Sequence, residues 1–314
     1  MHHLRLQCNS HSLFGTSRHW NSIALPERLC AVATTLRSPT VRRRRLAREL
    51  RELRKRFGMT LEQAAGQLDM SKSNLSRIET AEIGVKPRDV RAMLALYGVT
   101  GEDAEALIEI ARGARQRGWW QDYSDVMPDW FEFYVGLEAD ATSIATFEAE
   151  AVPGLLQTAE YARAITEVSW GDSSAERTVA VRMQRQAILR REPPPSLSVV
   201  LNEAVLLRPV GGAAVMRRQL EHLADLAQSP TVTIQVLPFS AGGHPAITRS
   251  YVILRFPDAI DDPVVHLDNL TVGLALEEPK HVDGYTLIHE RLCTMALSPE
   301  ESATRLEHAA RDLT

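Results

Sequence analysis

Cysteine is scarce in this chain, and its few positions are too scattered to form a site together. Cys8, Cys30 and Cys293 are the only three among 314 residues, and no CxxC pair or Cys/His cluster occurs. This distribution argues against a disulfide framework and a zinc site, and it fits a reducing compartment. No apolar run approaches the roughly 20 residues that a membrane span needs, and residues 1–38 lack the pattern of a secretory signal. We therefore expect a cytoplasmic protein with no membrane segment and no metal.

The chain also lacks the motifs of the common catalytic and cofactor sites. It contains no GxSxG nucleophile elbow, no HExxH metal motif, no P-loop and no GxGxxG loop. We therefore predict that the protein is not an enzyme, has no catalytic residues and binds no cofactor. A diverged enzyme is the alternative, in which turnover would depend on His244 or Glu203.

Charge is divided unevenly along the chain. Residues 1–118 contain 21 Lys and Arg against 12 Asp and Glu, a balance of +9. Residues 119–314 contain 15 against 28, a balance of −13, and the two parts sum to the formal net charge of −4. A basic first part on an acidic body suggests that the first part binds a polyanion. The alternative is two solvated surfaces of opposite sign.

The residue pattern separates an extension from two domains, a number that the chain length allows. Residues 1–38 show no periodicity, and we interpret them as a disordered or artefactual N-terminal extension. Residues 39–117 are rich in Leu, Ala, Arg and Glu at helical spacing, which predicts an all-α domain. Residues 118–314 mix strand-like and helical runs, so we expect a multidomain protein.

Five helices are predicted within residues 39–117. The first spans 42–56 and places Leu46, Leu50 and Leu53 on one face, and Gly58 is its natural stop. The next four begin at recognisable signals. These signals are a capping box of Thr60 with Gln63, a cap at Ser71, Pro87 at a first helical position, and Thr100.

The stretch from Thr60 to Glu79 has the layout of a helix-turn-helix. The small residues Ala64 and Ala65 stand where two helices would cross closely, and Leu75 would pin the second helix to the domain. This second helix turns donors and short polar groups outward, which suits the base edges of a DNA major groove. The predicted base-reading residues are Lys72, Ser73, Asn74, Ser76 and Arg77.

Phosphate contacts are predicted beside this helix. We expect an arginine run to lie along the DNA backbone and to make the affinity salt-dependent. The predicted phosphate-binding residues are Arg42, Arg43, Arg44 and Arg45, together with the helix caps Thr60, Gln63 and Ser71. The alternative is a five-helix bundle that merely has a basic face.

The segment LRELRKRFGMTLEQAAGQLDMSKSNLSRIE resembles the Cro/cI phage-repressor type of helix-turn-helix, also called the xenobiotic-response-element family. The resemblance implies a lambda-repressor-like domain in which Lys72, Ser73 and Arg77 match the base-reading positions. Two positions depart from the family pattern. Leu61 stands where the family usually has a Gln that helps to hold a phosphate, and Asp69 stands where the turn usually has Gly.

The second domain is predicted to be α/β or α+β, with helices packed on a mixed sheet. Runs of β-branched or alternating residues predict strands over 144–149, 197–201, 232–237, 251–256 and 264–267. Helical patterns cover 159–167, 176–191, 213–228, 279–296 and 299–311.

Five short sequence segments of this second domain resemble the C-terminal domain of actinobacterial antitoxin-like transcription regulators. They are GWWQDY, FEAEAVPGLLQTAEYA, EAVLLRPVGG, VTIQVLPFSAGGHP and ALSPEES, in this order. Proteins of this kind are commonly encoded beside a small partner protein. The resemblance implies transcription regulation and no known reaction.

Several polar residues near strand ends are candidates for an effector pocket in the second domain. They are Glu148, Gln157, Glu203, His244 and Asp268. For His244 the alternative is a loop histidine whose Gly and Pro neighbours shape a turn. Four aromatic residues lie outside the basic part, so we expect them to join the domains or fill the core rather than stack on bases. These are Trp119, Trp120, Trp130 and Tyr134.

Together these patterns predict a sequence-specific transcription regulator, associated with the nucleoid, that binds double-stranded DNA as a homodimer. Its C-terminal domain would bind a small-molecule effector or a small protein encoded nearby. The half-sites of such a dimer are expected about 34 Å apart. The alternative function is an antitoxin-like scaffold that sequesters a small partner protein and binds DNA for autoregulation.

Overall fold

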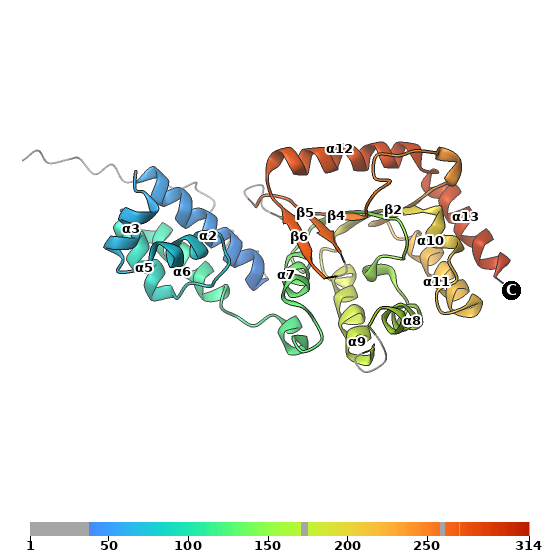
Figure 1. The fold of residues 1–314 in the computed structure, drawn as a ribbon, viewed down its shortest axis with the longest axis horizontal. Helices are drawn as coiled ribbons and strands as arrows, with labels where there is room; N and C mark the ends of the chain where they lie inside the picture. Colours follow the sequence, from blue (N-terminus) through green and yellow to red (C-terminus); the bar gives the residue numbers. More distant parts are fainter. Residues whose placement is uncertain (1–37, 171–174, 258–260, 270, 314) are drawn as a thin grey trace, which may run out of the picture.

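The computed structural model describes residues 38–170, 175–257, 261–269 and 271–313. The extension predicted over residues 1–38 therefore lies outside the described residues except for Ser38, as do Cys8 and Cys30. A group of helices is followed by a domain built on a mixed sheet, which confirms the predicted fold class (Figure 1).

The N-terminal domain consists of five helices, as predicted. They are α2 (Pro39–Arg56), α3 (Leu61–Gln67), α4 (Lys72–Glu79), α5 (Pro87–Leu96) and α6 (Gly101–Gly113). The predicted apolar face of α2 is buried in one core with residues of the other four helices. At least 99 % of the surface of Leu46, Leu50 and Leu53 is removed from water.

The predicted signals at Thr60, Ser71 and Pro87 hold in the structure, whereas Thr100 precedes α6 without a side-chain cap bond. Gln63 N–H donates to Thr60 Oγ1 over 3.2 Å, and Thr60 N–H donates to Gln63 Oε1 over 2.9 Å, which completes the capping box. Ser71 Oγ accepts from Asn74 N–H over 3.1 Å at the start of α4. Asp69 adopts a left-handed conformation with φ of 51°, so the turn keeps its geometry without the usual Gly.

Helix α2 begins three residues before the predicted start at residue 42. Ser38 caps it, with its Oγ accepting from Thr40 N–H over 3.2 Å, and Pro39 occupies the first helical position. The Ser38 main-chain N–H also donates to Asp140 Oδ2 over 2.7 Å. The start of α2 is therefore tied to the second domain.

The second domain contains a six-stranded sheet in the order β3-β2-β1-β4-β5-β6. The first three strands are parallel to one another, and the last three alternate in direction. The strands are β1 (Ser143–Glu148), β2 (Ser196–Asn202), β3 (Val232–Leu237), β4 (Tyr251–Arg255), β5 (Val264–Asp268) and β6 (Gly273–Leu276).

Five of the six strands were predicted to within a residue at each end, whereas β6 was missed. This strand is short and begins at Gly273, a residue type that is uncommon in strands. A Cβ at Gly273 would lie 2.5 Å from the Trp130 ring and 2.8 Å from the His266 ring. The glycine is needed because these two rings pack on it, and sequence alone does not show that contact.

Helices cover both faces of the sheet (Figure 1). One long helix, α12, packs on the face formed by Ala145 and Phe147. The other face, to which Ile144 and Thr146 point, is covered by several shorter helices. The helices of this domain are α7 (Asp129–Glu138), α8 (Ala159–Trp170), α9 (Ala175–Arg185), α10 (Glu203–Leu207), α11 (Ala213–Leu226), α12 (Pro279–Met295) and α13 (Pro299–Asp312).

Short 3₁₀ segments link these elements at Trp119–Tyr123, Gly154–Leu156, Gln186–Arg190 and Phe239–Ala241. The helix predicted over 176–191 therefore changes at Arg185 from an α-helix into a 3₁₀ segment. The helices α7 and α10 were not predicted. Helix α7 has apolar and aromatic residues around most of its circumference, so no clean helical stripe marks it.

Helix α2 contributes to the cores of both domains. Val41 lies in the core of the second domain with Trp120 and Tyr134, whereas Leu46 lies in the N-terminal core. Gly136 of α7 packs against the N-terminal end of α2, and its carbonyl accepts a hydrogen bond from Ser38 Oγ. Trp120 is 4 % exposed at the same contact, which confirms that this aromatic joins the domains.

The close approach of α2 to α7 predicts that Gly136→Ala destabilises the protein. A Cβ at Gly136 would lie 2.1 Å from Thr40 Oγ1 and 2.7 Å from Thr40 Cβ. We expect a loss of about 1–3 kcal/mol in the free energy of unfolding, because such overpacking forces the helices apart. Thermal unfolding measures it. The control Gly284→Ala has no atom within 4 Å of its new Cβ, and equal melting temperatures for the two variants would contradict the prediction.

Candidate functional site

The predicted base-reading side chains lie on the outer face of α4. Lys72, Ser73, Asn74 and Arg77 are exposed, and Ser76 is partly buried. The opposite face of the helix is held in the N-terminal core by Leu75 and Ile78, which are 0 % and 4 % exposed. Base reading by these residues stays a prediction. Their exposure to solvent is what base reading requires.

A buried ion pair fixes α4 on α2. Arg54 Nε lies 2.7 Å from Glu79 Oε1, and a second guanidinium nitrogen of Arg54 lies 2.8 Å from Glu79 Oε2. Arg54 also donates to the carbonyl of Met59 over 2.7 Å. The hydrogen bond that Arg54 donates to Glu79 raises the pKa of Arg54 above its ordinary value, although burial opposes this shift. Two parallel bonds of this kind set both the position and the rotation of α4.

Two carboxylates lie beside the exposed cations of α4. Lys72 Nζ is 3.6 Å from Glu62 Oε2, and Arg77 Nε is 3.4 Å from Glu82 Oε2. All four side chains are more than half exposed. Exposed pairs of this kind contribute roughly 0–1 kcal/mol, so Lys72 and Arg77 can exchange these partners for a nucleic acid.

The structure contradicts the phosphate-binding role predicted for Arg45. This side chain is 1 % exposed and pairs with Glu49 over 3.0 Å and with Asp261 over 3.4 Å. Arg44 is mostly buried as well, and it pairs with Glu277 over 2.9 Å. The arginine run thus faces the acidic edge of the second domain. The rise of an α-helix also places it about 15 Å from Arg54, where α2 meets α4.

The other two arginines of the run lie nearby. A guanidinium nitrogen of Arg42 lies 1.8 Å from the point where Gly113 of α6 would carry a Cβ, so the two residues are in close contact. Burial lowers the pKa of Arg43. A phosphate contact by either residue remains a prediction.

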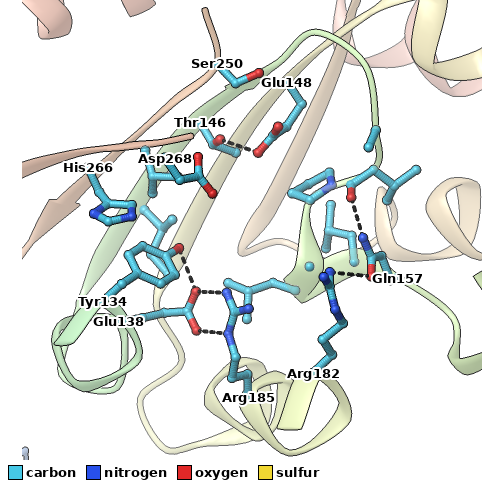
Figure 2. Close-up of a pocket in the computed structure, with 18 of the residues that line it drawn as sticks. Tyr134, Glu138, Thr146, Glu148, Gln157, Arg182, Arg185, Ser250, His266 and Asp268 are labelled. Atoms are coloured by element: carbon cyan, nitrogen blue, oxygen red, sulfur yellow. Dashed lines mark hydrogen bonds and ion pairs between the residues drawn. The ribbon is translucent and has the colours of Figure 1, made fainter. Parts of the chain in front are cut away.

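A polar pocket lies between the sheet and the helices α7 and α9 (Figure 2). Its volume is about 200 Å³. Three of the predicted pocket residues line it, namely Glu148 at the end of β1, Asp268 at the end of β5, and Gln157. Figure 2 shows Arg182 and Arg185 of α9 entering from the side opposite to Glu148 and Asp268.

The other two predicted pocket residues, Glu203 and His244, do not line this pocket. Glu203 accepts a hydrogen bond from Phe239 N–H over 2.8 Å and pairs with Arg305 over 2.9 Å. His244 packs edge-on against Phe147, with ring centroids 5.2 Å apart. Phe147 lies on the sheet face that α12 covers. Its neighbour Glu148 points to the opposite face, because successive side chains of a strand alternate between the two faces.

The floor of the pocket is an ionic cluster that sequence reasoning missed. Arg185 donates to both oxygens of the Glu138 carboxylate, over 2.8 and 2.7 Å, and Tyr134 O–H donates to Glu138 over 2.8 Å. All three residues are at least 93 % buried. Burial, followed by the charge of Glu138, raises the pKa of Tyr134 well above its ordinary value. Tyr134 and Glu138 are four residues apart, a helical spacing that could have indicated them.

The remaining polar groups of the pocket are less well satisfied. Burial, followed by the charge of Asp268, raises the pKa of Glu148 to about 8. Burial, followed by the charge of Arg185, lowers the pKa of Arg182 to about 10. His266 is 3 % exposed between the rings of Trp130 and Tyr134, and neither of its ring nitrogens has a hydrogen-bond partner among the described residues.

The part of the chain that the structure describes shows neither a metal site nor a membrane-spanning helix. Within these residues, no three or more His, Cys, Asp or Glu side chains gather closely enough to hold a metal ion. None of the described helices has both the length and the apolar character that crossing a membrane requires.

Comparison with protein families places both parts of the chain. A family model described as "Domain of unknown function (DUF5753)" matches residues 131–308, more than half of the chain. The chain belongs to the DUF5753 family. A second model, described as "Helix-turn-helix domain", matches residues 45–107. No curated protein and no solved structure matches the chain significantly.

The helix-turn-helix match covers α3 and α4 and most of the surrounding bundle. Together with the exposed face of α4, it indicates a DNA-binding transcription regulator. The DUF5753 domain contains the whole polar pocket, since every residue that lines it lies between 131 and 308.

The buried pair of α2 and α4 predicts a large effect of Glu79→Gln on stability. Removing the carboxylate leaves the Arg54 guanidinium buried without a counter-charge, which costs about 3–5 kcal/mol. We expect a clearly lower melting temperature in thermal unfolding. The matched control is Glu52→Gln, because Glu52 pairs with Lys55 at an exposed site over 2.8 Å and should cost about 0.5 kcal/mol or less. The same small loss in both variants would refute a structural role of the buried pair.

The raised pKa of Glu148 predicts a pH-dependent stability. The folded protein retains a proton on Glu148 up to about pH 8, whereas an unfolded chain releases it near pH 4.5. The folded state therefore binds more protons between these values, and this group destabilises the DUF5753 domain increasingly as pH rises from 5 to 8.

The variant Glu148→Gln removes this contribution. Its melting temperature, measured relative to the parent chain, should rise between pH 5 and pH 8. The exposed residue Glu167 on α8 provides the control Glu167→Gln, which should show no such trend. Parallel pH profiles for the parent and Glu148→Gln would show that Glu148 titrates normally.

Proposed function

We propose that this protein is a Cro/cI-type transcription regulator that reads DNA with α4 and binds an effector in the pocket of its DUF5753 domain. The observation that carries the proposal is the outer face of α4, which offers Lys72, Asn74 and Arg77 to solvent. The inner face is clamped by the Arg54–Glu79 pair. A rigidly held helix with free donors is what base reading in a major groove requires.

The chemistry of this face suits base edges. Lys72 and Arg77 can donate to O6 and N7 of guanine, and Asn74 can pair with adenine through two hydrogen bonds. Ser73 and Ser76 are short enough to let the helix enter the groove. The caps Thr60, Gln63 and Ser71 hold the start of α3 and α4, where free main-chain N–H groups can bind phosphate oxygens.

The proposed link between effector and DNA is helix α7. Tyr134 and Glu138 of this helix form the floor of the pocket, while Gly136 contacts the first turn of α2. A ligand that displaces α7 would therefore move α2, to which α4 is fixed by the Arg54–Glu79 pair. The protein would sense a small molecule through this packed series of helices.

We propose the domain limits on the same grounds. Residues 39–117 would bind DNA, and residues 118–314 would regulate that binding. A single α4 contacts only a few base pairs, so we propose a homodimer whose two reading helices address half-sites about 34 Å apart.

The experiment that tests this function is DNA binding by Arg77→Ala. The operator is first located by footprinting the purified protein on genomic DNA. Loss of the guanidinium should weaken binding by about 1–3 kcal/mol, or roughly 5- to 150-fold in Kd, and should relax specificity at one base pair. A mobility-shift titration measures both effects.

The control for this titration is Arg112→Ala. Arg112 is an exposed arginine of α6 that pairs with Glu109 and lies outside the reading face. Arg112→Ala should change the Kd by no more than about twofold, because it removes the same charge away from the reading face. If Arg77→Ala bound every site as tightly as the parent chain, α4 would not be the reading helix.

A further inference from the structure

The size of the DUF5753 pocket restricts its ligand to a small molecule. Its volume of about 200 Å³ equals roughly seven water molecules at about 30 Å³ each. Pockets for drug-sized ligands are larger, about 300–1,000 Å³. The lining includes the apolar residues Ile144, Leu156 and Val252 as well as its charged groups. A molecule of about the size of an amino acid fits these limits.

Two carboxylates at one side of the pocket have no cationic partner. In the described part of the chain, neither Glu148 nor Asp268 forms an ion pair, and the hydrogen bonds that Glu148 accepts come from the neutral hydroxyls of Thr146, over 3.1 Å, and Ser250. The charge of Asp268 raises the pKa of Glu148, so the two groups repel each other when both are ionised. A cationic ligand group between them would relieve this repulsion.

The two arginines on the opposite side differ in their partners. Arg185 is neutralised by the two bonds to Glu138. Arg182 donates one hydrogen bond, to Gln157 Oε1 over 3.1 Å, and its buried Nε has no partner among the described residues. Arg182 therefore keeps donors and a positive charge for a ligand acceptor. Arg guanidinium groups bind carboxylates particularly well because two of their N–H groups are parallel.

We propose that this pocket binds an α-amino acid, whose ammonium group lies between Glu148 and Asp268 and whose carboxylate accepts hydrogen bonds from Arg182. The side chain of the amino acid lies along Ile144, Leu156 and Val252, which favours an apolar one. The proposal deepens the proposed function, since it names the chemical class of the effector. A purely anionic ligand would leave both carboxylates unpaired, and a simple amine would leave Arg182 unpaired.

The first test is thermal unfolding of the full chain with each of the twenty standard L-amino acids. At about 100 times its Kd, a ligand that binds only the folded protein should raise the melting temperature by about 5 °C. Each active amino acid is then compared with the 2-hydroxy acid and the amine of the same side chain. The proposal predicts a shift of less than 1 °C for these two, because each lacks one charge.

Three outcomes would overturn the proposal. They are no shift with any amino acid, an equal shift with the 2-hydroxy acid, and an equal shift with the amine. The comparison uses the unmodified protein, so its result does not depend on how well a variant folds.

The second test locates the site with calorimetric titration of the best amino acid. Glu148→Gln and Arg182→Gln should each weaken binding at least tenfold. The controls Glu167→Gln and Arg190→Gln remove the same charges at exposed positions on α8 and beside α9, and should keep the parent Kd. Unchanged affinity in both pocket variants would place the ligand elsewhere and refute the assignment.

The mobility-shift titration of the unliganded parent chain separates this proposal from the proposed function. DNA binding without any amino-acid effect would refute the ligand class and leave the DNA-binding function intact. An amino-acid effect without DNA binding would refute the proposed function and keep the pocket assignment.

Discussion

The structure depends on one helix that is buried at both of its ends in different cores. Helix α2 has 18 residues, so it is about 27 Å long. Val41 packs in the core of the DUF5753 domain, whereas Leu53 packs in the core of the helix-turn-helix domain. A continuous helix resists bending because its main-chain hydrogen bonds would break. The orientation of the DNA-reading domain is therefore coupled to the contact between α2 and α7.

Electrostatics reinforces this coupling. The positive charge of the N-terminal part is not spread evenly over its surface, since Arg44, Arg45 and Arg48 pair with carboxylates of the second domain. Exposed basic residues remain on α4, at Lys72 and Arg77, and on the second half of α2, at Arg51, Lys55 and Arg56. The basic surface that is exposed to solvent is consequently smaller than the net charge suggests, and part of the opposite charge of the two domains is used to hold them together.

The topology of the sheet builds the pocket. Strand β1 has a parallel neighbour on one side and an antiparallel neighbour on the other, and β5 runs in the same direction as β1 because two reversals separate them. Glu148 and Asp268, the last residues of β1 and β5, therefore lie at the same end of the sheet. Helices α7 and α9 bring the arginine side of the pocket to this end. Charged residues from β1, β5, α7 and α9 thus converge on one small pocket.

The sequence by itself determined the local structure of this protein. Capping boxes, glycine stops and alternating apolar residues located the five N-terminal helices and five of the six strands, because these signals act between residues close together in the chain. They also located α4 and its polar outer face. Tertiary structure alone decided which charged residues meet. Arg45 was predicted for DNA and pairs with Asp261, and Glu203 was predicted for the pocket and pairs with Arg305. Partners more than 100 residues apart leave no periodic signal, since only the packing of complete elements brings them together.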